Sequence, residues 1–169
     1  MAATSPAPGL RPYMPADAAT LAALFRESVD ELAEEDYDDA QREAWASEAD
    51  DAEAFGARLA GELTIVALVN GEIAGFASLR DNAIFDMLYV RPDMARQGVG
   101  SALADAIEKL AGARGTATLS VDASDAARDF FAARGYVATT RNTMEIAGQW
   151  LGNTTMTREL AAPAAGSAH

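Results

Sequence analysis

The segment from Leu88 to Leu103, LYVRPDMARQGVGSAL, has the residue types of an anion-binding loop. An apolar stretch typical of a strand leads into Gly98 and Gly100, and helix-forming residues follow. The first amides of a helix lack backbone partners, and the helix dipole adds partial positive charge there. Glycines let a phosphate approach these amides, and Arg96 adds a guanidinium for a phosphate oxygen. The loop therefore predicts a site for a pyrophosphate.

The spacing in this loop excludes two common phosphate motifs. No Gly-Lys-Ser/Thr follows, as a Walker loop requires, and no third glycine completes a dinucleotide fingerprint. A bare Gly-x-Gly is weakly specific, so a glycine-rich loop without a ligand remains the alternative.

Missing residue types restrict the remaining chemistry. The chain has no cysteine, and its one histidine is the last residue, His169. This excludes a thiol nucleophile and disfavours a Ser-His-Asp triad or a metal site, so we expect no metal. A general base must then be Asp, Glu, Tyr, a terminus or water.

The formal net charge of −13 disfavours nucleic acid and anionic membranes as partners. It would favour a cationic acceptor such as an amine, although an acidic surface that aids solubility is the simpler explanation. No apolar run reaches the roughly 20 residues of a membrane span, and the first residues do not resemble a secretory signal. We therefore expect a cytoplasmic protein.

Hydrophobic periodicity and turn residues predict one α+β domain over residues 10–160, between disordered tails at 1–9 and 161–169. The sheet is predicted to be mixed, mostly antiparallel and about seven-stranded. Its strands are expected at 10–14, 62–69, 72–80, 83–90, 116–121, 136–146 and 150–160, with turns at Asn70-Gly71, Asp81-Asn82 and 147–149. Helices are expected from Asp17, from Asp38 or Asp39, around Phe55 and Leu59 up to Gly61, at 99–111, and from Ser124 to Arg134.

Two motifs then make a family resemblance specific. Leu-Tyr-Val-x-Pro, five residues and Gly-x-Gly-x-x-Leu resemble the acetyl-CoA signature of the GNAT superfamily of N-acetyltransferases. Ala123–Tyr136 (ASDAARDFFAARGY) is similar to the next motif of this family. The stretch WLGNTTM at 150–156 is similar to the last strand of a bacterial subgroup. The resemblance covers about residues 10–160 and implies helices on both faces of the sheet.

Three positions depart from the family pattern. Ala95 replaces the first Gln or Arg of the signature, and Ser124 stands where many relatives have Asn. Phe131 stands where many have a Tyr that reprotonates the CoA thiolate, and Phe cannot donate a proton.

The resemblance implies acetyl-CoA as cosubstrate, with its pantetheine arm between the strands at 83–90 and 116–121. Backbone groups of Leu88, Tyr89 and Val90 would bind this arm. The implied pyrophosphate ligands are the amides of Arg96, Gln97, Gly98, Val99, Gly100 and Ser101. Ser124, Phe130 and Phe131 would lie along the arm near the sulfur.

The implied reaction is direct attack by a neutral amine, so a base must remove a proton from the ammonium form. Asp86 is one candidate, since alternation along its strand predicts that it shares a face with Leu88. Asp122 and Glu27 are the others, and each of the three could instead be a solvated or structural carboxylate. Tyr37 and Tyr89 are the candidate proton donors to the sulfur, with packing roles or solvent as alternatives.

Other aromatic and polar residues have simpler roles. Phe25, Trp45 and Phe55 are expected in the core, while Asn153 and Trp150 could line an acceptor pocket or form a turn.

Three functions remain open. The chain could acetylate a small amine, such as an aminoglycoside-like drug, a polyamine or an amino acid derivative. It could acetylate protein N-termini or lysines, or bind CoA as a regulatory module without turnover. A homodimer is a further possibility.

Overall fold

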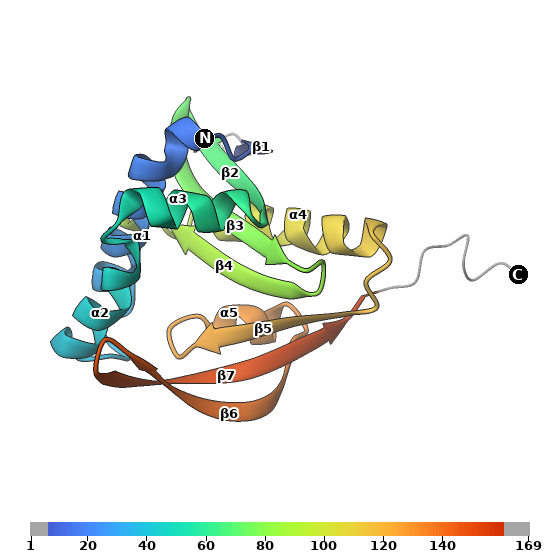
Figure 1. Cartoon of the computed structure of the whole chain (residues 1–169). Coiled ribbons are helices and arrows are strands. Elements are labelled where there is room, and N and C mark those ends of the chain that lie inside the picture. The colour runs from blue at the N-terminus through green and yellow to red at the C-terminus, as the bar shows by residue number, and fades with distance from the viewer. Residues whose placement is uncertain (1–6, 161–169) are drawn as a thin grey trace, which may run out of the picture.

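The computed structural model describes residues 7–160, so His169 and most of both expected tails lie outside the described residues. The seven expected strands form one sheet in the order β1-β2-β3-β4-β5-β7-β6 (Figure 1). All neighbouring strands pair antiparallel except β4 and β5, which are parallel. The strands are β1 (Gly9–Pro12), β2 (Leu63–Val69), β3 (Glu72–Arg80), β4 (Ile84–Val90), β5 (Thr118–Ser124), β6 (Val137–Ile146) and β7 (Gln149–Glu159).

Three hairpins have the turn geometry that the sequence predicts. The central residues Asn70 and Gly71 have φ values of 53° and 81°, and Asp81 and Asn82 have 53° and 59°. Ala147 and Gly148, at 47° and 82°, join β6 to β7, so Gln149 already belongs to the strand. Positive φ at both central residues matches the twist of paired strands, which explains the Asn-Gly sequence.

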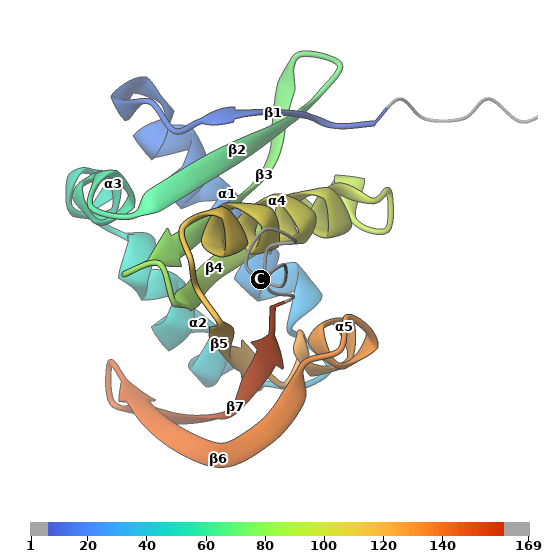
Figure 2. The same cartoon turned by 90° about the vertical axis from the view of Figure 1, so that its right-hand side faces the viewer.

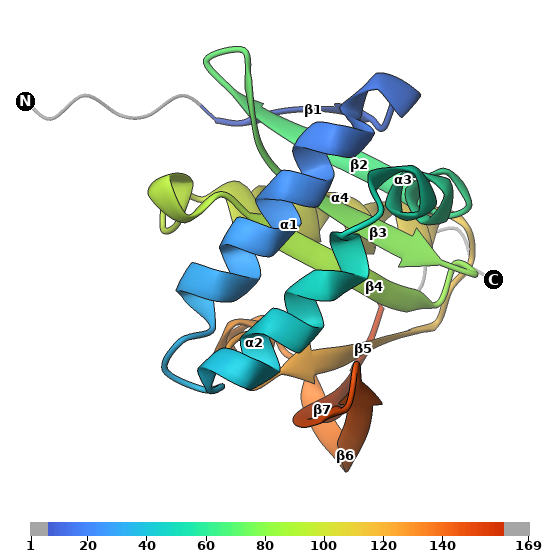
Figure 3. The same cartoon turned by 60° about the vertical axis from the view of Figure 1, so that its left-hand side comes forward.

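The helices cover both faces of the sheet, as expected. They are α1 (Ala18–Leu32), α2 (Asp39–Ala46), α3 (Ala52–Ala60), α4 (Val99–Ala113) and α5 (Arg128–Ala133). Figure 3 shows α1, α2 and α3 in front of the sheet, and Figure 2 shows α4 on the opposite face. One core packs α4 and α5 against residues such as Phe85 and Leu119, and the other packs α1 and α3 against Phe76. Within residues 7–160, no helix has the length and apolar character to cross a bilayer.

Helix starts follow the predicted caps in one case and not in another. Asp38 caps α2 by accepting a 2.8 Å hydrogen bond from the Gln41 amide. Asp17 does not cap α1 with its side chain, because its carboxylate accepts hydrogen bonds from Arg11 and from the Met14 amide.

The second half of the chain differs from the predicted bounds. β5 continues to Ser124, since β7 pairs with it as far as the Ser124–Asn153 pair. The Ser124 hydroxyl accepts a hydrogen bond from the Ala127 amide at 3.2 Å and closes a turn, so α5 begins only at Arg128. The predicted cap at Ser124 was therefore wrong by three residues, since Ala127 directly precedes α5.

Strands β4 and β5 part toward their carboxyl ends (Figure 1). They pair only at Ile84–Ser120 and Phe85–Val121, whereas β4 continues to Val90. The expected splay of these strands is confirmed, and it leaves backbone groups of Leu88 to Val90 without a partner strand on that side.

Candidate active site

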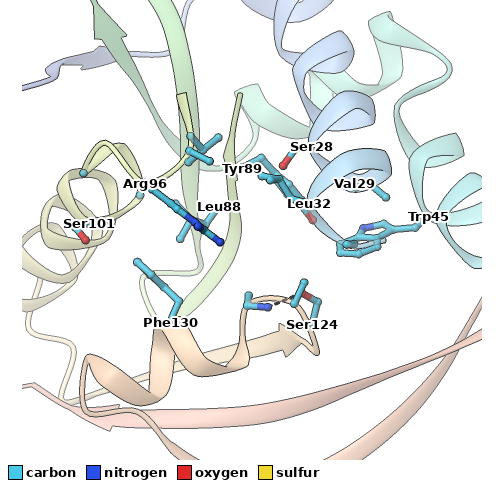
Figure 4. Close-up of a pocket in the computed structure, with 17 residues that line it drawn as sticks. Ser28, Val29, Leu32, Trp45, Leu88, Tyr89, Arg96, Ser101, Ser124 and Phe130 are labelled. Carbon is cyan, nitrogen blue, oxygen red and sulfur yellow. Dashed lines mark hydrogen bonds between the residues drawn. The ribbon is translucent and has the colours of Figure 1, made fainter. Parts of the chain in front are cut away.

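A cleft of about 490 Å³ opens where β4 and β5 part (Figure 4). Its walls come from the end of β4, the loop before α4, the turn before α5, and the carboxyl half of α1. Lining residues are Ser28, Val29, Leu32, Ala33, Trp45, Leu88, Tyr89, Val90, Ala95, Arg96, Gly98, Gly100, Ser101, Ser124, Ala126, Ala127 and Phe130.

The loop at one end of this cleft presents the start of α4. Gly98 has φ 82°, which a glycine adopts at little cost, and Arg96 has φ 66°. The helical ladder begins with the Ala102 amide, which donates to the Gly98 carbonyl at 3.0 Å. The amides of Val99, Gly100 and Ser101 therefore precede the ladder and carry the positive end of the helix dipole.

Gly100 faces into the cleft. A Cβ atom built on it would lie 3.7 Å from the Phe130 ring and 3.8 Å from a Val90 methyl group. Arg96 extends across the cleft in Figure 4. The loop thus combines unpaired amides, a guanidinium and space for a large anion.

Most of the predicted cofactor residues line this cleft, and three lie elsewhere. Gln97 is exposed, and its side chain donates to the Asp93 carbonyl at 3.4 Å. The side chain of Val99, the first residue of α4, is buried, with a methyl group close to Gly75. Phe131 is buried against Phe85, 5.3 Å between ring centroids, and reaches only a small hollow between β4 and β5.

The α1 wall of the cleft was missed by the sequence analysis. Ser28 is buried on an otherwise apolar helix face, and Leu32 is 43% exposed at the end of the same helix. The signal that the sequence offered for this wall is a serine among the apolar positions of the helix, at Ser28. Trp45 packs against the core as expected and also lines the cleft, and Phe25 and Phe55 are core residues as predicted.

A second hollow of about 250 Å³ adjoins the first and shares Trp45, Tyr89 and Ser124 with it. Charged and polar side chains dominate one side, and the β6–β7 hairpin forms the other. Further lining residues are Tyr37, Glu48, Arg58, Arg80, Asp86, Asp122, Met144, Ile146, Leu151, Gly152 and Asn153.

Asp86 lies in this second hollow, on the face of the sheet opposite to Leu88. The register between β3 and β4 shifts at Asp86, since Ser78 pairs with Met87 and Leu79 with Phe85. Leu88 consequently packs with Phe85 toward α4, while Asp86 binds Arg58 of α3. The prediction that Asp86 and Leu88 share a face was wrong, because a β-bulge resets the alternation.

Two arginines hold the Asp86 carboxylate. Arg58 donates to it at 3.0 Å, and Arg80 lies 3.9 Å away. Burial opposes ionisation of Asp86, but the neighbouring Glu62 carboxyl group and the hydrogen bond from Arg58 outweigh burial and lower the pKa of Asp86. The side chain is 13% exposed, so an anion is held at the wall of the hollow.

Asp122 and Glu27 lie in different surroundings. Asp122 is exposed at the second hollow and accepts a 2.6 Å hydrogen bond from Thr155. Glu27 is exposed on α1 and lines neither the cleft nor the second hollow.

The two candidate tyrosines differ in their contacts. The Tyr37 hydroxyl donates to the Gly152 carbonyl and accepts from the Asp125 amide, so both of its interactions are structural. Tyr89 packs edge-on against Phe25 at 4.5 Å and lies where the cleft and the hollow meet. Burial raises the pKa of Tyr89, so its hydroxyl is protonated at neutral pH.

The comparison with known proteins agrees with this geometry. Residues 33–160 match the model of the acetyltransferase (GNAT) domain. The uncharacterized N-acetyltransferase YafP of Escherichia coli K12 is 34% identical over 144 residues, which are 85% of this chain and 91% of that protein.

Solved structures share the fold. A GCN5-related N-acetyltransferase from Rhodopseudomonas palustris is 54% identical, with a TM-score of 0.91 over 95% of this chain and 100% of that one. The PaiA N-acetyltransferase of Thermoplasma acidophilum, solved in complex with coenzyme A, is 17% identical, with a TM-score of 0.74 over 91% and 99% of the two chains. The chain therefore belongs to the GNAT superfamily and is an N-acetyltransferase.

Proposed function

We propose that this protein transfers the acetyl group of acetyl-CoA to the primary amine of a small molecule, by direct attack in a ternary complex. The observation that carries the proposal is the junction of two sites. A cleft that begins at the amides of α4 meets an acidic hollow at Trp45, Tyr89 and Ser124.

The first cleft suits the cosubstrate. The amides of Val99, Gly100 and Ser101, with Arg96, would hold the pyrophosphate. The unpaired edge of β4 at Leu88 to Val90 would bind the pantetheine arm as a strand is bound, and Phe130 would pack along it. PaiA in its complex with coenzyme A has the same fold, which supports this assignment.

The second hollow suits the acceptor. At about 250 Å³ it has room for a small molecule, and the β6–β7 hairpin residues Met144 and Leu151 close one side. Three carboxylates at its wall, those of Glu48, Asp86 and Asp122, outnumber two guanidinium groups, those of Arg58 and Arg80. This balance of charge favours a cation. Transfer to a protein N-terminus or lysine remains the alternative, since an extended residue could also enter the hollow.

Within such a complex the protein contributes positioning and charge. Acetyl-CoA supplies a thioester whose carbonyl carbon accepts the amine. Backbone amides of β4 would stabilise the developing oxyanion, and Asp86 or Asp122 would accept a proton from the ammonium group. The Tyr89 hydroxyl would donate a hydrogen bond toward the leaving sulfur.

An acceptor screen tests this proposal. Purified protein and acetyl-CoA are incubated with polyamines, aminoglycosides, amino acid derivatives and peptides, and free thiol release is measured. We expect turnover with a small amine, and a loss of roughly 10²-fold in kcat for Asp86→Asn or Asp122→Asn, whichever is the base. Thiol release only with peptides would favour the protein substrate, and none at all would favour a regulatory CoA-binding module.

A further inference from the structure

A second carboxyl group, that of Glu62, is buried behind Asp86. Glu62 directly precedes β2, and its side chain is 7% exposed. Its Oε2 atom lies 3.7 Å from Arg58 Nε, while Oε1 is buried without a hydrogen-bond partner among residues 7–160. The Ser78 hydroxyl is likewise buried and without a partner in this part of the chain. Unsatisfied buried polar atoms are rare and call for an explanation.

The charges around Glu62 do not balance if all groups are ionised. Arg58 from α3 and Arg80 from the end of β3 face Asp86. Glu48, which precedes α3, interacts with both Arg58 and Asp86. Three carboxyl groups thus face two guanidinium groups, so a full set of charges leaves one buried negative charge uncompensated.

We propose that Glu62 and Asp86 form a carboxyl pair that holds at most one proton between them, and that Glu62 takes up the acceptor's proton through Asp86. Glu62 touches neither the cleft nor the hollow, so it acts through Asp86. The inference rests on the proposed function, in that the second hollow holds the amine.

The surroundings of the pair support this division of roles. Burial, followed by the neighbouring Asp86 carboxylate, raises the pKa of Glu62 to about 7. Asp86 is held as an anion by Arg58 and is therefore a weak final base. Glu62 titrates near the working pH, which makes it the more effective final base. Like charges at close range separate the titrations of such a pair.

The proton balance is simple. In the reactive form both carboxyl groups of the pair are ionised. The ammonium N–H bond breaks, an O–H bond forms on Asp86, and this proton then passes on to Glu62. The neutral amine attacks the thioester, and the second amine proton leaves with the CoA sulfur as the thiol. Glu62 then returns its proton to solvent through Asp86, so each turnover releases one proton.

A titration of the free protein tests the shared proton without any turnover. The side-chain carboxyl carbons of wild type, Glu62→Gln and Asp86→Asn are followed by 13C NMR from pH 4 to 9. We expect one Glu signal to titrate near pH 7 in wild type, to vanish in Glu62→Gln and to move to lower pH in Asp86→Asn. A Glu62 signal that titrates below pH 5.5 in the wild type would overturn the proposal.

The pH profile of kcat/KM tests the route of the proton. In wild type the rate should rise up to about pH 7 and then level off, because ionised Glu62 accepts the proton of a bound ammonium. The kcat/KM profile of Glu62→Gln should lose the bend near pH 7 and rise up to the pKa of the amine itself. At pH 7 the kcat/KM of this variant should be lower than that of wild type by roughly 10²-fold. Glu53→Gln, an exposed glutamate on α3, should keep the wild-type profile.

The two experiments distinguish the possible failures. A Glu62→Gln profile identical to wild type, with normal turnover, would contradict the relay and leave the proposed function intact. Absence of turnover with every amine would contradict the proposed function and the relay together. The titration would still decide whether the pair shares a proton.

Discussion

The hydroxyl of Tyr37 donates a 2.6 Å hydrogen bond to the carbonyl of Gly152, which ties the segment between α1 and α2 to β7. The same oxygen accepts a hydrogen bond from the Asp125 amide at 2.8 Å. The Tyr37 side chain thereby connects its own segment with β7 and with the turn after β5, which lie 115 and 88 positions away in the sequence.

Removing this hydroxyl should destabilise the protein. Tyr37→Phe leaves a part-buried carbonyl and an amide without partners, which costs about 1–3 kcal/mol. The free energy of unfolding from urea titration measures the loss. Tyr13→Phe is the matched control, because its 3.4 Å bond to Gly56 is long, and it should cost less than about 1 kcal/mol. Equal losses in the two variants would contradict the role given to Tyr37.

Gly75 sets the distance between the sheet and α4. A Cβ atom there would lie 2.8 Å from the Tyr89 carbonyl oxygen and 3.1 Å from a Val99 methyl group. Gly75→Ala should therefore displace the start of α4, destabilise the protein by about 1–3 kcal/mol and weaken CoA binding. Calorimetric titration with CoA measures the second effect. Gly9→Ala in β1, where the nearest atom is 4.0 Å away, should change neither, and unaltered CoA affinity in Gly75→Ala would refute the link to α4.

Burial of Glu62 predicts a pH dependence of stability. Its folded pKa of about 7 exceeds the unfolded value of 4.5, so the stabilisation is complete below pH 4.5 and is lost as pH rises through 7. Between pH 5 and 9, the free energy of unfolding of wild type should fall by on the order of 2 kcal/mol relative to that of Glu62→Gln, allowing for partial solvation. If the free energy of unfolding, measured by urea titration at each pH, changes equally with pH in the two proteins, the pKa of Glu62 is not raised.

Tyr89→Phe separates a chemical role from packing, since it keeps the ring against Phe25 and removes only the hydroxyl. If the hydroxyl assists departure of the sulfur, kcat should fall at least about tenfold while KM for acetyl-CoA stays constant. Steady-state thiol release measures both constants. An unchanged kcat would mean that solvent serves this step.

The sequence predicted the features that local chemistry determines. Asn70-Gly71 requires a hairpin turn, and the Gly98 loop requires a helix start with free amides, so both could be placed without knowledge of the fold. The resemblance of residues 88–103 to a known signature also predicted the cleft between β4 and β5.

The features that were missed depend on contacts between distant segments. The face of Asp86 follows from a register shift against β3, which strand alternation alone does not show. Glu62 and Asp86 meet only when β2, β3 and β4 are aligned, so Glu62 gave no signal in the sequence. The second hollow also needs Tyr37 to contact β7, a pairing that no local pattern predicts.

CoA affinity in Gly100→Trp and Gly112→Trp, measured by calorimetric titration, tests the central claim most directly. The Gly100 side chain would enter the cleft beside Phe130, whereas no atom lies within 4 Å of a Cβ at Gly112 on the same helix. The account predicts at least a tenfold loss of affinity for Gly100→Trp and wild-type affinity for Gly112→Trp. Wild-type affinity in Gly100→Trp would contradict the assignment of this cleft to the cosubstrate.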